Sequence, residues 1–502
     1  MTDLLSKDRI VAGPGFNRWL VPPAALAVHL SIGMAYGFSV FWLPLSRSIG
    51  ITTSSPADWK ISTLGWIYTL FFLTLGSSAA IFGPWAERAG PRKTGVIAAF
   101  CWGGGFFVSA LGVRLHQVGL LWLGSGIIGG CGLGLGYISP VSTLIKWFPD
   151  RRGLATGLAI MGFGGGAMIG SPLADILMRR FATASSVGVW ETFVVMGTLY
   201  FVAMMAGAFG YRLPPDGWAP AGWTREKVAA TASRVARYVP VAVASRTPQF
   251  WLLWAVLCLN VTAGIGILGM ASPMIQEVSK GRVTASGAAG FAGLLSLFNI
   301  GGRIVWSSLS DRIGRKWTYS IFFALGMLLY ASVPLAGSAG RLSLFVAIFC
   351  LALTMYGGGF ATIPAYLADL FGVHNVSAIH GRVLTAWSTA GILGPVLVNY
   401  IREFQISRGV APADAYTATM YVLVGLLGLG LICNLAVRPV ADRLQVVITS
   451  GRGRPEMPAS RVDAAAASAT HPGLVVAAWT IAAFPIVWGV SQTLTLASQM
   501  LR

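Results

Sequence analysis

The sequence predicts an all-α polytopic membrane protein with two six-helix repeats and one extra transmembrane helix near its C-terminus. Of its 502 residues, 55% are hydrophobic and only 11% are charged, which is about half the charged share of a soluble protein. The apolar residues form long runs, close to the ~20 residues that a membrane-spanning helix needs. Matching residues at a nearly constant spacing predict the repeat. Several soluble domains of this total length are therefore excluded.

Charged residues and Pro/Gly breaks separate the apolar segments. The six of the first half lie near 21–45, 62–83, 94–113, 119–146, 153–177 and 191–211. The six of the second half lie near 249–273, 286–309, 317–336, 342–367, 377–400 and 416–437. A further segment, 473–495, is also long enough to span the membrane. It carries no charge, so we expect a peripheral helix that is either accessory or in contact with a partner.

Two polar segments divide these spans into domains. The basic segment 212–247 falls midway and is predicted to be a cytoplasmic linker between a first bundle, 1–211, and a second, 248–437. The tail 438–472 is rich in Ala, Pro and Ser, which is typical of a linker. It leads into the extra helix 473–495.

The net charge of +19 is explained by orientation in a membrane. Basic residues lie mostly between the spans, and more of them fall on the side of the N-terminus. Because such segments stay in the cytoplasm, we expect a cytoplasmic N-terminus in a bacterial-type plasma (inner) membrane, and no binding of nucleic acid. Residues 1–19 are polar and lack an apolar h-region, so no cleavable signal peptide is expected.

The two halves share anchor residues at one offset. The pairs are Gly90 with Gly314 and Pro140 with Pro364, each 224 residues apart, and Pro172 with Pro395, 223 apart. Three anchors at one offset predict that the second six helices repeat the first six in parallel, as in transporters with a site at the interface of two repeats.

No constellation typical of an enzyme is found in the sequence. The five cysteines lie singly in apolar segments, and the five histidines form no HxxxH or HExxH pattern, so neither a metal nor a cofactor is expected. The glycine-rich stretches 130–136 and 162–170 lack the Walker Lys and a preceding strand. Small residues at these places favour close packing of membrane helices.

The stretches "GPWAERAGPRK" (83–93) and "SSLSDRIGRK" (307–316) match each other. The first resembles the loop signature G-x-x-x-D-R-x-G-R-K/R of the major facilitator superfamily, with Glu87 in place of Asp and Pro91 at the first basic position. The resemblance implies that these charges pair at the cytoplasmic surface and favour one side-open state; the alternative is a solvated charged turn. The expected conformational motif comprises Gly83, Glu87, Arg88, Gly90, Asp311, Arg312, Gly314 and Arg315.

A longer stretch, "GYISPVSTLIKWFPDRRGLATGLAIMGFGGGAMIGSPL" (136–173), is more specific. It resembles the helix 4–5 signature of the oxalate/formate antiporter family and of the related monocarboxylate transporters. Residues 17–45 resemble the first helix of that family, and the resemblance covers about 17–437. It implies a transporter of small organic anions that works by alternating access.

Arg303 lies inside the apolar part of 297–316. Counted from Asp311 at ~1.5 Å per residue, it lies ~12 Å within the predicted helix. A charge at that depth costs several kcal/mol unless it is paired or faces water; snorkelling toward the surface is the alternative. The repeat partner of Arg303 is Ala79, so the fold does not require a charge here. In the resembled family an Arg of helix 8 binds the substrate carboxylate, which implies the same role for Arg303.

The rest of that family's site is matched only in part. Where helix 11 of the oxalate transporter has a Lys in T-A-K-x-T-A, this chain reads "TAWSTA" (385–390), with Trp387 at that position. One cation disfavours a dianion such as oxalate and favours a monoanion whose apolar group lies against an aromatic ring. Arg382 is either a second cation or a first-turn residue near the cytoplasm. Asn299 stands where proton-coupled monocarboxylate transporters have an Asp.

Aromatic residues complete the expected substrate site. It comprises Arg303, Trp387, Tyr36, Asn299, Tyr137, Tyr356 and Arg382, although each aromatic residue is equally open to a packing role. The acids nearest to the interior of the predicted spans are Asp175 and Asp369, and both lie near a span end. No carboxylate is therefore placed to carry a coupling proton, which favours anion exchange or facilitated diffusion over proton symport.

The leading hypothesis is a monomeric carrier of small monocarboxylates such as formate, lactate or pyruvate. Its alternatives are oxalate/formate exchange and efflux of other organic molecules, for which a largely aromatic cavity would matter. A non-transporting membrane sensor is a third hypothesis, disfavoured because no soluble signalling domain is visible. An enzyme is not expected.

Overall fold

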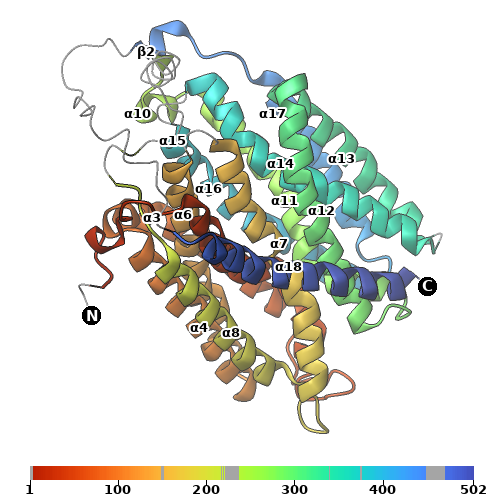
Figure 1. Cartoon of the computed structure of the whole chain (residues 1–502). Helices are drawn as coiled ribbons and strands as arrows, with labels where there is room; N and C mark the ends of the chain where they lie inside the picture. The colour runs from red at the N-terminus through yellow and green to blue at the C-terminus, as the bar shows by residue number, and fades with distance from the viewer. Residues whose placement is uncertain are drawn as a thin grey trace.

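The computed structural model describes residues 4–148, 152–215, 218, 220, 237–338, 340–372, 376–447 and 470–501. Thirteen helical segments within these residues are long and apolar enough to cross a membrane. Figure 1 shows the first six (red to yellow) and the next six (green to blue) as two neighbouring groups, with the last helix across the front. The predicted all-α polytopic fold is confirmed.

Each group contains six spanning segments. The first group consists of α1–η3–α2 (Val21–Ile32, Gly33–Phe41, Trp42–Leu45), α3 (Ile61–Ala89), α4 (Pro91–Arg114), α5–η4–α6 (Val118–Leu121, Trp122–Gly129, Gly130–Trp147), α7 (Arg152–Phe181) and α8 (Val189–Gly210). The second group consists of α11 (Pro248–Val278), α12 (Ala285–Ile313), α13 (Arg315–Ser338), α14 (Leu342–Phe371), α15–α16 (Val376–Val383, Thr385–Ser407) and α17 (Thr417–Ala436). The extra helix is α18 (Pro472–Leu501).

The remaining elements are short. They are η1 (Asp8–Ile10), η2 (Arg18–Leu20), α10 (Val241–Ala244), η5 (Asp442–Leu444), β1 (Arg237–Tyr238) and β2 (Val446–Val447). The two strands form an antiparallel ladder that pairs Arg237 with Val447 and Tyr238 with Val446. The sequence analysis did not predict this ladder, which joins the segment between the two groups to the tail that follows the second.

The anchor residues occupy equivalent places in the two groups. Gly90 ends α3 and Gly314 ends α12, and both have a φ of +86°. Residues other than glycine are strained at such a φ, so these glycines allow the tight turns into α4 and α13. Each anchor proline lies inside a helix: Pro140 in α6, Pro364 in α14, Pro172 in α7 and Pro395 in α16. The predicted repeat is confirmed.

Glycines fix the first spanning segment against α7. A Cβ atom built at Gly33 would lie 2.3 Å from the carbonyl oxygen of Phe163, and one at Gly37 would lie 2.3 Å from Ser171 Oγ. Only glycine permits this approach. Between them the chain forms the 3₁₀ helix η3, which places Tyr36 in the interior, where it is fully buried.

The eleventh span is interrupted. The sequence predicts one helix over 377–400, but α15 ends at Val383 and α16 begins at Thr385. Leu384 separates them, and the backbone N–H of Trp387 donates to its carbonyl oxygen. Trp387 therefore lies in the first turn of α16, where it is 1% exposed.

The bundle has two ends. The motif end is the one at which α3 turns into α4 and α12 turns into α13, and it carries residues 83–93 and 307–316. The distal end is the opposite one, at which α2 ends and α12 begins.

Candidate functional site

Arg303 lies on α12 at the contact between the two groups of helices. Its side chain is buried, and its Nε donates a hydrogen bond of 3.3 Å to Asn299 Oδ1 one turn earlier. The guanidinium carbon lies 5.6 Å from the centre of the Phe360 ring of α14. Opposite it stands Gly164 of α7, where a Cβ atom would come within 3.3 Å of Arg303 Nε. The guanidinium thus fills space that a glycine of the first group leaves open.

No carboxylate pairs with Arg303 among the residues that the structure describes. The acids that form ion pairs within these residues pair with other arginines: Asp175 with Arg179, Asp311 and Asp369 with Arg315, and Glu277 with Arg402. A buried cation without a counter-charge is costly in a membrane protein. A bidentate anion would offset that cost, because the guanidinium fork matches a carboxylate.

Aromatic rings from both groups surround this charge. We define the central cluster as Arg303, Asn299, Tyr36, Phe72, Tyr137, Phe163, Tyr356, Phe360 and Trp387. The Tyr356 hydroxyl donates a 2.9 Å hydrogen bond to the Tyr36 hydroxyl, which joins α14 to η3 across the two groups.

Trp387 is the centre of the ring contacts. Its ring lies 4.6 Å from Phe360, 5.5 Å from Tyr137, 5.6 Å from Phe163 and 5.7 Å from Phe72, measured between ring centroids. Phe360 contacts both Trp387 and the guanidinium of Arg303. An anion on Arg303 would therefore lie beside an apolar, ring-lined surface.

Two hydrogen-bond donors in the central cluster lack an acceptor. Asn299 Nδ2 and Trp387 Nε1 are buried and have no hydrogen-bond partner in the described part of the chain. Unsatisfied buried polar atoms are rare in folded proteins and costly. Together with Arg303 they make a donor-rich site, which suits a ligand that only accepts hydrogen bonds.

The distal end is closed by contacts between the two groups. Trp42 Nε1 donates to the Gly269 carbonyl oxygen at 2.6 Å, and Trp66 Nε1 donates to the Tyr400 hydroxyl at 2.8 Å. The Ser272 backbone N–H lies 3.4 Å from Ser39 Oγ. These bonds connect η3–α2 with α11 and α3 with α16, so the central cluster is shut off from the distal end.

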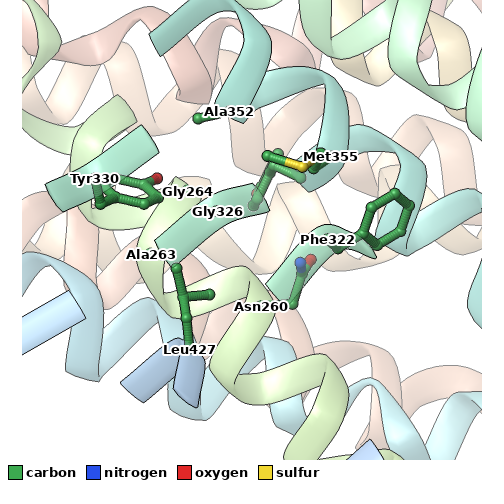
Figure 2. A pocket seen from close by; sticks show the side chains of 10 residues that line it. Asn260, Ala263, Gly264, Phe322, Gly326, Tyr330, Ala352, Met355 and Leu427 are labelled. Carbon is green, nitrogen blue, oxygen red and sulfur yellow. The ribbon is translucent and has the colours of Figure 1, made fainter. Parts of the chain in front are cut away.

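A small crevice lies beside Tyr356. It is lined by residues of α11, α13, α14 and α17. Figure 2 shows Asn260, Phe322 and Tyr330 around it. Because Gly264 of α11 touches the Tyr356 ring, the crevice and the central cluster share one wall.

The comparisons with known proteins agree with this architecture. The family model of the Major Facilitator Superfamily matches residues 16–395 and, a second time, residues 289–501. The chain belongs to the Major Facilitator Superfamily. Members of this superfamily are membrane transporters, and the protein is a multi-pass membrane protein with thirteen candidate spans in its described residues.

Relatives of known sequence are similar over most of the chain. An uncharacterized MFS-type transporter, YhjX, of Escherichia coli is 27% identical over 376 residues, 75% of this chain and 86% of the relative. The oxalate:formate antiporter of Oxalobacter formigenes is 26% identical over 382 residues, 75% of this chain and 83% of the relative. Apicoplast pyruvate carrier 1 of Toxoplasma gondii is 25% identical over 458 residues, 78% of each chain. The resemblance to the oxalate/formate antiporter family is confirmed.

A solved structure has the same fold. A bacterial homologue of the human lysosomal transporter Spinster, in an inward-facing and occupied conformation, superposes with a TM-score of 0.63 at 15% identity. The match covers 85% of this chain and 97% of that chain. At this identity the likeness concerns the fold alone.

Most residues of the superfamily's loop motif lie in the part of the chain that the structure describes. Arg315 pairs with Asp311 and lies 3.6 Å from an oxygen of Asp369 on α14, while Lys316 Nζ donates to the carbonyl oxygens of Leu435 and Val437 at the end of α17. Among the other motif residues, Arg312 and Arg88 are exposed at the same end, and a Cβ atom at Gly83 would meet nothing. The side chain of Glu87 lies outside the described residues.

The structure brings together six of the seven residues predicted for the substrate site. Arg382 is the exception: it is exposed, and its Nη1 donates to Ser245 Oγ and to the Val241 carbonyl oxygen at 3.3 Å. It therefore lies near α10 at the motif end, outside the central cluster.

Three residues of the central cluster were missed by the sequence analysis: Phe72, Phe163 and Phe360. Phenylalanines in apolar spans carry no signal that separates a site from packing. Phe163 did have one usable signal, since it is the only large side chain within "GFGGGA" (162–167). Glycines that bring helices together leave such a residue to fill the interface.

The unpaired state of Arg303 yields a prediction about stability. Arg303→Met removes a buried charge that has no carboxylate partner in the described residues, so the melting temperature in detergent should rise or stay unchanged. Arg402→Met is the matched comparison, because Arg402 is also buried but is paired with Glu277. Its loss leaves the carboxylate of Glu277 without its cation and should lower the free energy of unfolding by about 3–5 kcal/mol. Equal destabilisation by both variants in a thermal-shift assay would contradict this account of Arg303.

Proposed function

We propose that this protein carries small organic monocarboxylates across a membrane by alternating access, with Arg303 as the carboxylate ligand. The observation that carries the proposal is the buried guanidinium of Arg303, which has no carboxylate partner in the described residues and is enclosed by aromatic rings. The antiporter of oxalate and formate and the pyruvate carrier among the relatives support the substrate class.

A single cation at the site supports a monoanion. Arg303 is the only Lys or Arg of the central cluster, since Trp387 stands where the resembled family has a Lys and Arg382 lies elsewhere. A dianion would leave one negative charge buried without a partner, which is unfavourable. Formate, lactate and pyruvate carry one charge, and the last two carry a methyl group that fits against Trp387 or Phe360.

Exchange of oxalate for formate is the second candidate function. It is favoured by the relative from Oxalobacter formigenes, which resembles this chain over three quarters of its length. Asn299 Nδ2 and Trp387 Nε1 would then have to stabilise the second carboxylate as neutral donors. Neutral donors stabilise an anion less than a Lys does, so we rank this function second.

Alternating access follows from how the groups meet. In the present arrangement the bonds of Trp42 and Trp66 close the distal end. For a substrate to leave there, these bonds would break while contacts at the motif end form. The Tyr36–Tyr356 bond lies at the central cluster and joins both groups, so it would respond to the same motion.

The acids in the described part of the chain give no evident route for a coupling proton. Three acids that lie in helices pair with arginines away from Arg303: Asp175, Asp369 and Glu277. Glu277 is helical because α11 extends beyond its apolar run. We therefore propose anion exchange or facilitated diffusion in preference to proton symport.

Orientation and domain division belong to the same proposal. The basic segments at the motif end support a cytoplasmic N-terminus in a bacterial inner membrane. We further propose two bundles, 1–211 and 248–437, joined by a linker, and a monomeric carrier without enzymatic activity. No cluster of His, Cys, Asp or Glu able to hold a metal occurs in the described residues.

The principal test is uptake by reconstituted protein of labelled formate, lactate, pyruvate and oxalate. Arg303→Ala should lower monocarboxylate uptake by about two orders of magnitude, since it removes the charge-assisted bonds to the carboxylate. Arg303→Lys should retain part of it, with a higher KM, because an ammonium group cannot bind in a bidentate way. Arg382→Ala is the control and should transport normally. Undiminished uptake by Arg303→Ala would sink the site assignment.

Trp387 sets the preference for monoanions in this proposal. Trp387→Lys places a second cation beside Arg303 and should raise the ratio of oxalate to pyruvate uptake by about tenfold. Trp387→Gln, which removes the ring without adding charge, should not raise that ratio. If wild-type protein already takes up oxalate well above the monoacids, the interpretation of Trp387 is wrong.

Asn299 offers a test of coupling. In Asn299→Asp the new carboxylate would pair with Arg303 and compete with the substrate until it is protonated. Uptake by this variant should therefore be weak at high pH and rise as the pH falls, whereas wild-type uptake should depend little on the pH gradient. Strong dependence of wild-type uptake on that gradient would show that a proton carrier has been overlooked.

A further inference from the structure

The extra helix α18 lies across the junction of the two groups, apart from the central cluster. Figure 1 shows it (dark blue) crossing the front of the molecule, and it contacts α1, η2 and α7 of the first group and α12 of the second. Most of its side chains are exposed; Ile481, Phe484 and Val487 are among the most exposed apolar residues in the described chain. Its few buried residues are therefore informative.

The first set of contacts ties α18 to the first group. Near the motif end, Trp479 Nε1 donates to the Trp19 carbonyl oxygen at 3.0 Å. Further along, Thr493 Oγ1 donates to the carbonyl oxygen of Met168 in α7 at 3.1 Å. Gly489 lies against the same turn of α7, where a Cβ atom would come within 2.7 Å of Ile169 Cγ1.

The second set ties the end of α18 to the distal end of α12. Three glycines one turn apart, Gly287, Gly290 and Gly293, face it. A Cβ atom at Gly290 would lie 2.7 Å from Leu496 Cβ, and one at Gly293 would lie 2.3 Å from Thr493 Oγ1. Thr493, which is fully buried, is thus in contact with both α7 and α12.

We propose that α18 is a clamp that holds the middle of α7 and the distal part of α12 together, and that Thr493 is its positioning residue. The two helices belong to different groups, which must separate at the distal end whenever that end opens. Because α18 is bound to α7 on one side and to α12 on the other, separation breaks one of the two sets of contacts. The clamp therefore biases the transporter toward the state that is closed at the distal end.

The clamp acts on the same helix pair that carries the substrate site. Ser296 Oγ, one turn beyond Gly293, donates to the carbonyl oxygen of Gly164, the glycine that faces Arg303. Thr493 and Arg303 thus lie along one seam between α7 and α12. Loosening the clamp changes the population of the two states, and with it the apparent affinity of the site.

The test measures opening of the distal end directly. In a background in which Cys101, Cys131, Cys258, Cys350 and Cys433 are replaced by Ser, the reporter is Ser272→Cys. Ser272 is 3% exposed, and its backbone N–H contacts Ser39 across the closed distal end. The rate of modification by a water-soluble maleimide is measured on protein in nanodiscs, without substrate, so the result depends neither on the substrate nor on the orientation proposed above.

Thr493→Val removes the bond to Met168 and should raise the modification rate about threefold, the scale of one hydrogen bond between membrane helices. Gly489→Leu, which pushes α18 off α7, should raise it further. Thr480→Val is the matched control, because Thr480 is exposed on the same helix and bonds only to Val476 within it. Gly425→Leu, in open space on α17, is the control for the larger side chain.

Each result of this experiment either supports or overturns the clamp. Faster modification of the Thr493 and Gly489 variants, with both controls unchanged and all proteins monodisperse, supports the clamp. An unchanged rate in the two variants overturns it. An equal increase in Thr480→Val also overturns it, because α18 would then act through general loosening and not through the seam. Loss of transport in an otherwise monodisperse Thr493→Val protein without a change in modification rate likewise contradicts a conformational role.

Discussion

The close contact between α7 and α12 is the constraint on which the site depends. Gly164 leaves room for the guanidinium of Arg303, and Ser296, two turns earlier on α12, binds the same stretch of α7. Because the two helices belong to different groups, the surroundings of the charge are complete only while the groups are in contact. Binding of an anion and the relative position of the groups are therefore coupled through one seam, and α18 lies along that seam.

Much of the fold follows from simple properties of the chain. Apolar runs of sufficient length located all thirteen spans, and the offset of 224 predicted the repeat that Gly90 and Gly314 display as matching turns. What could not be predicted depends on tertiary contacts. The break at Leu384 and the 3₁₀ stretch of η3 occur where helices pack on glycines or on one another, and no local pattern announces them.

The site was predictable where energetics singled out a residue. A buried charge without a repeat counterpart is conspicuous in an apolar chain, and Arg303 was found that way. Phe72, Phe163 and Phe360 were not, because a phenylalanine in a membrane helix costs nothing wherever it lies. Arg382 is five residues before Trp387, which corresponds to roughly 140° around a continuous helix. The two therefore point to different faces of the span, as the contacts of Arg382 with Ser245 and Val241 confirm.

The two repeats share close helix packing but differ in the residues that form the site. In the first group a Cβ atom at Gly134 would lie 2.1 Å from Ser78 Oγ, so α3 and α6 are in close contact. In the second group the residue 224 positions after Ser78 is Gly302, which packs equally closely on Thr354 of α14. Close packing of the two helices is thus repeated, although the contacting residues differ.

The next residue along each helix is not repeated. It is Ala79 in α3 and Arg303 in α12, so only the second group supplies a charge. Both groups supply rings, among them Tyr36 and Phe163 of the first and Phe360 and Trp387 of the second. A site with one cation and several aromatic rings matches a ligand with one charged and one apolar end. A symmetric dianion would need a second cation, which the central cluster lacks because Trp387 stands where the resembled family has a Lys, and this is the physical reason for proposing a monocarboxylate.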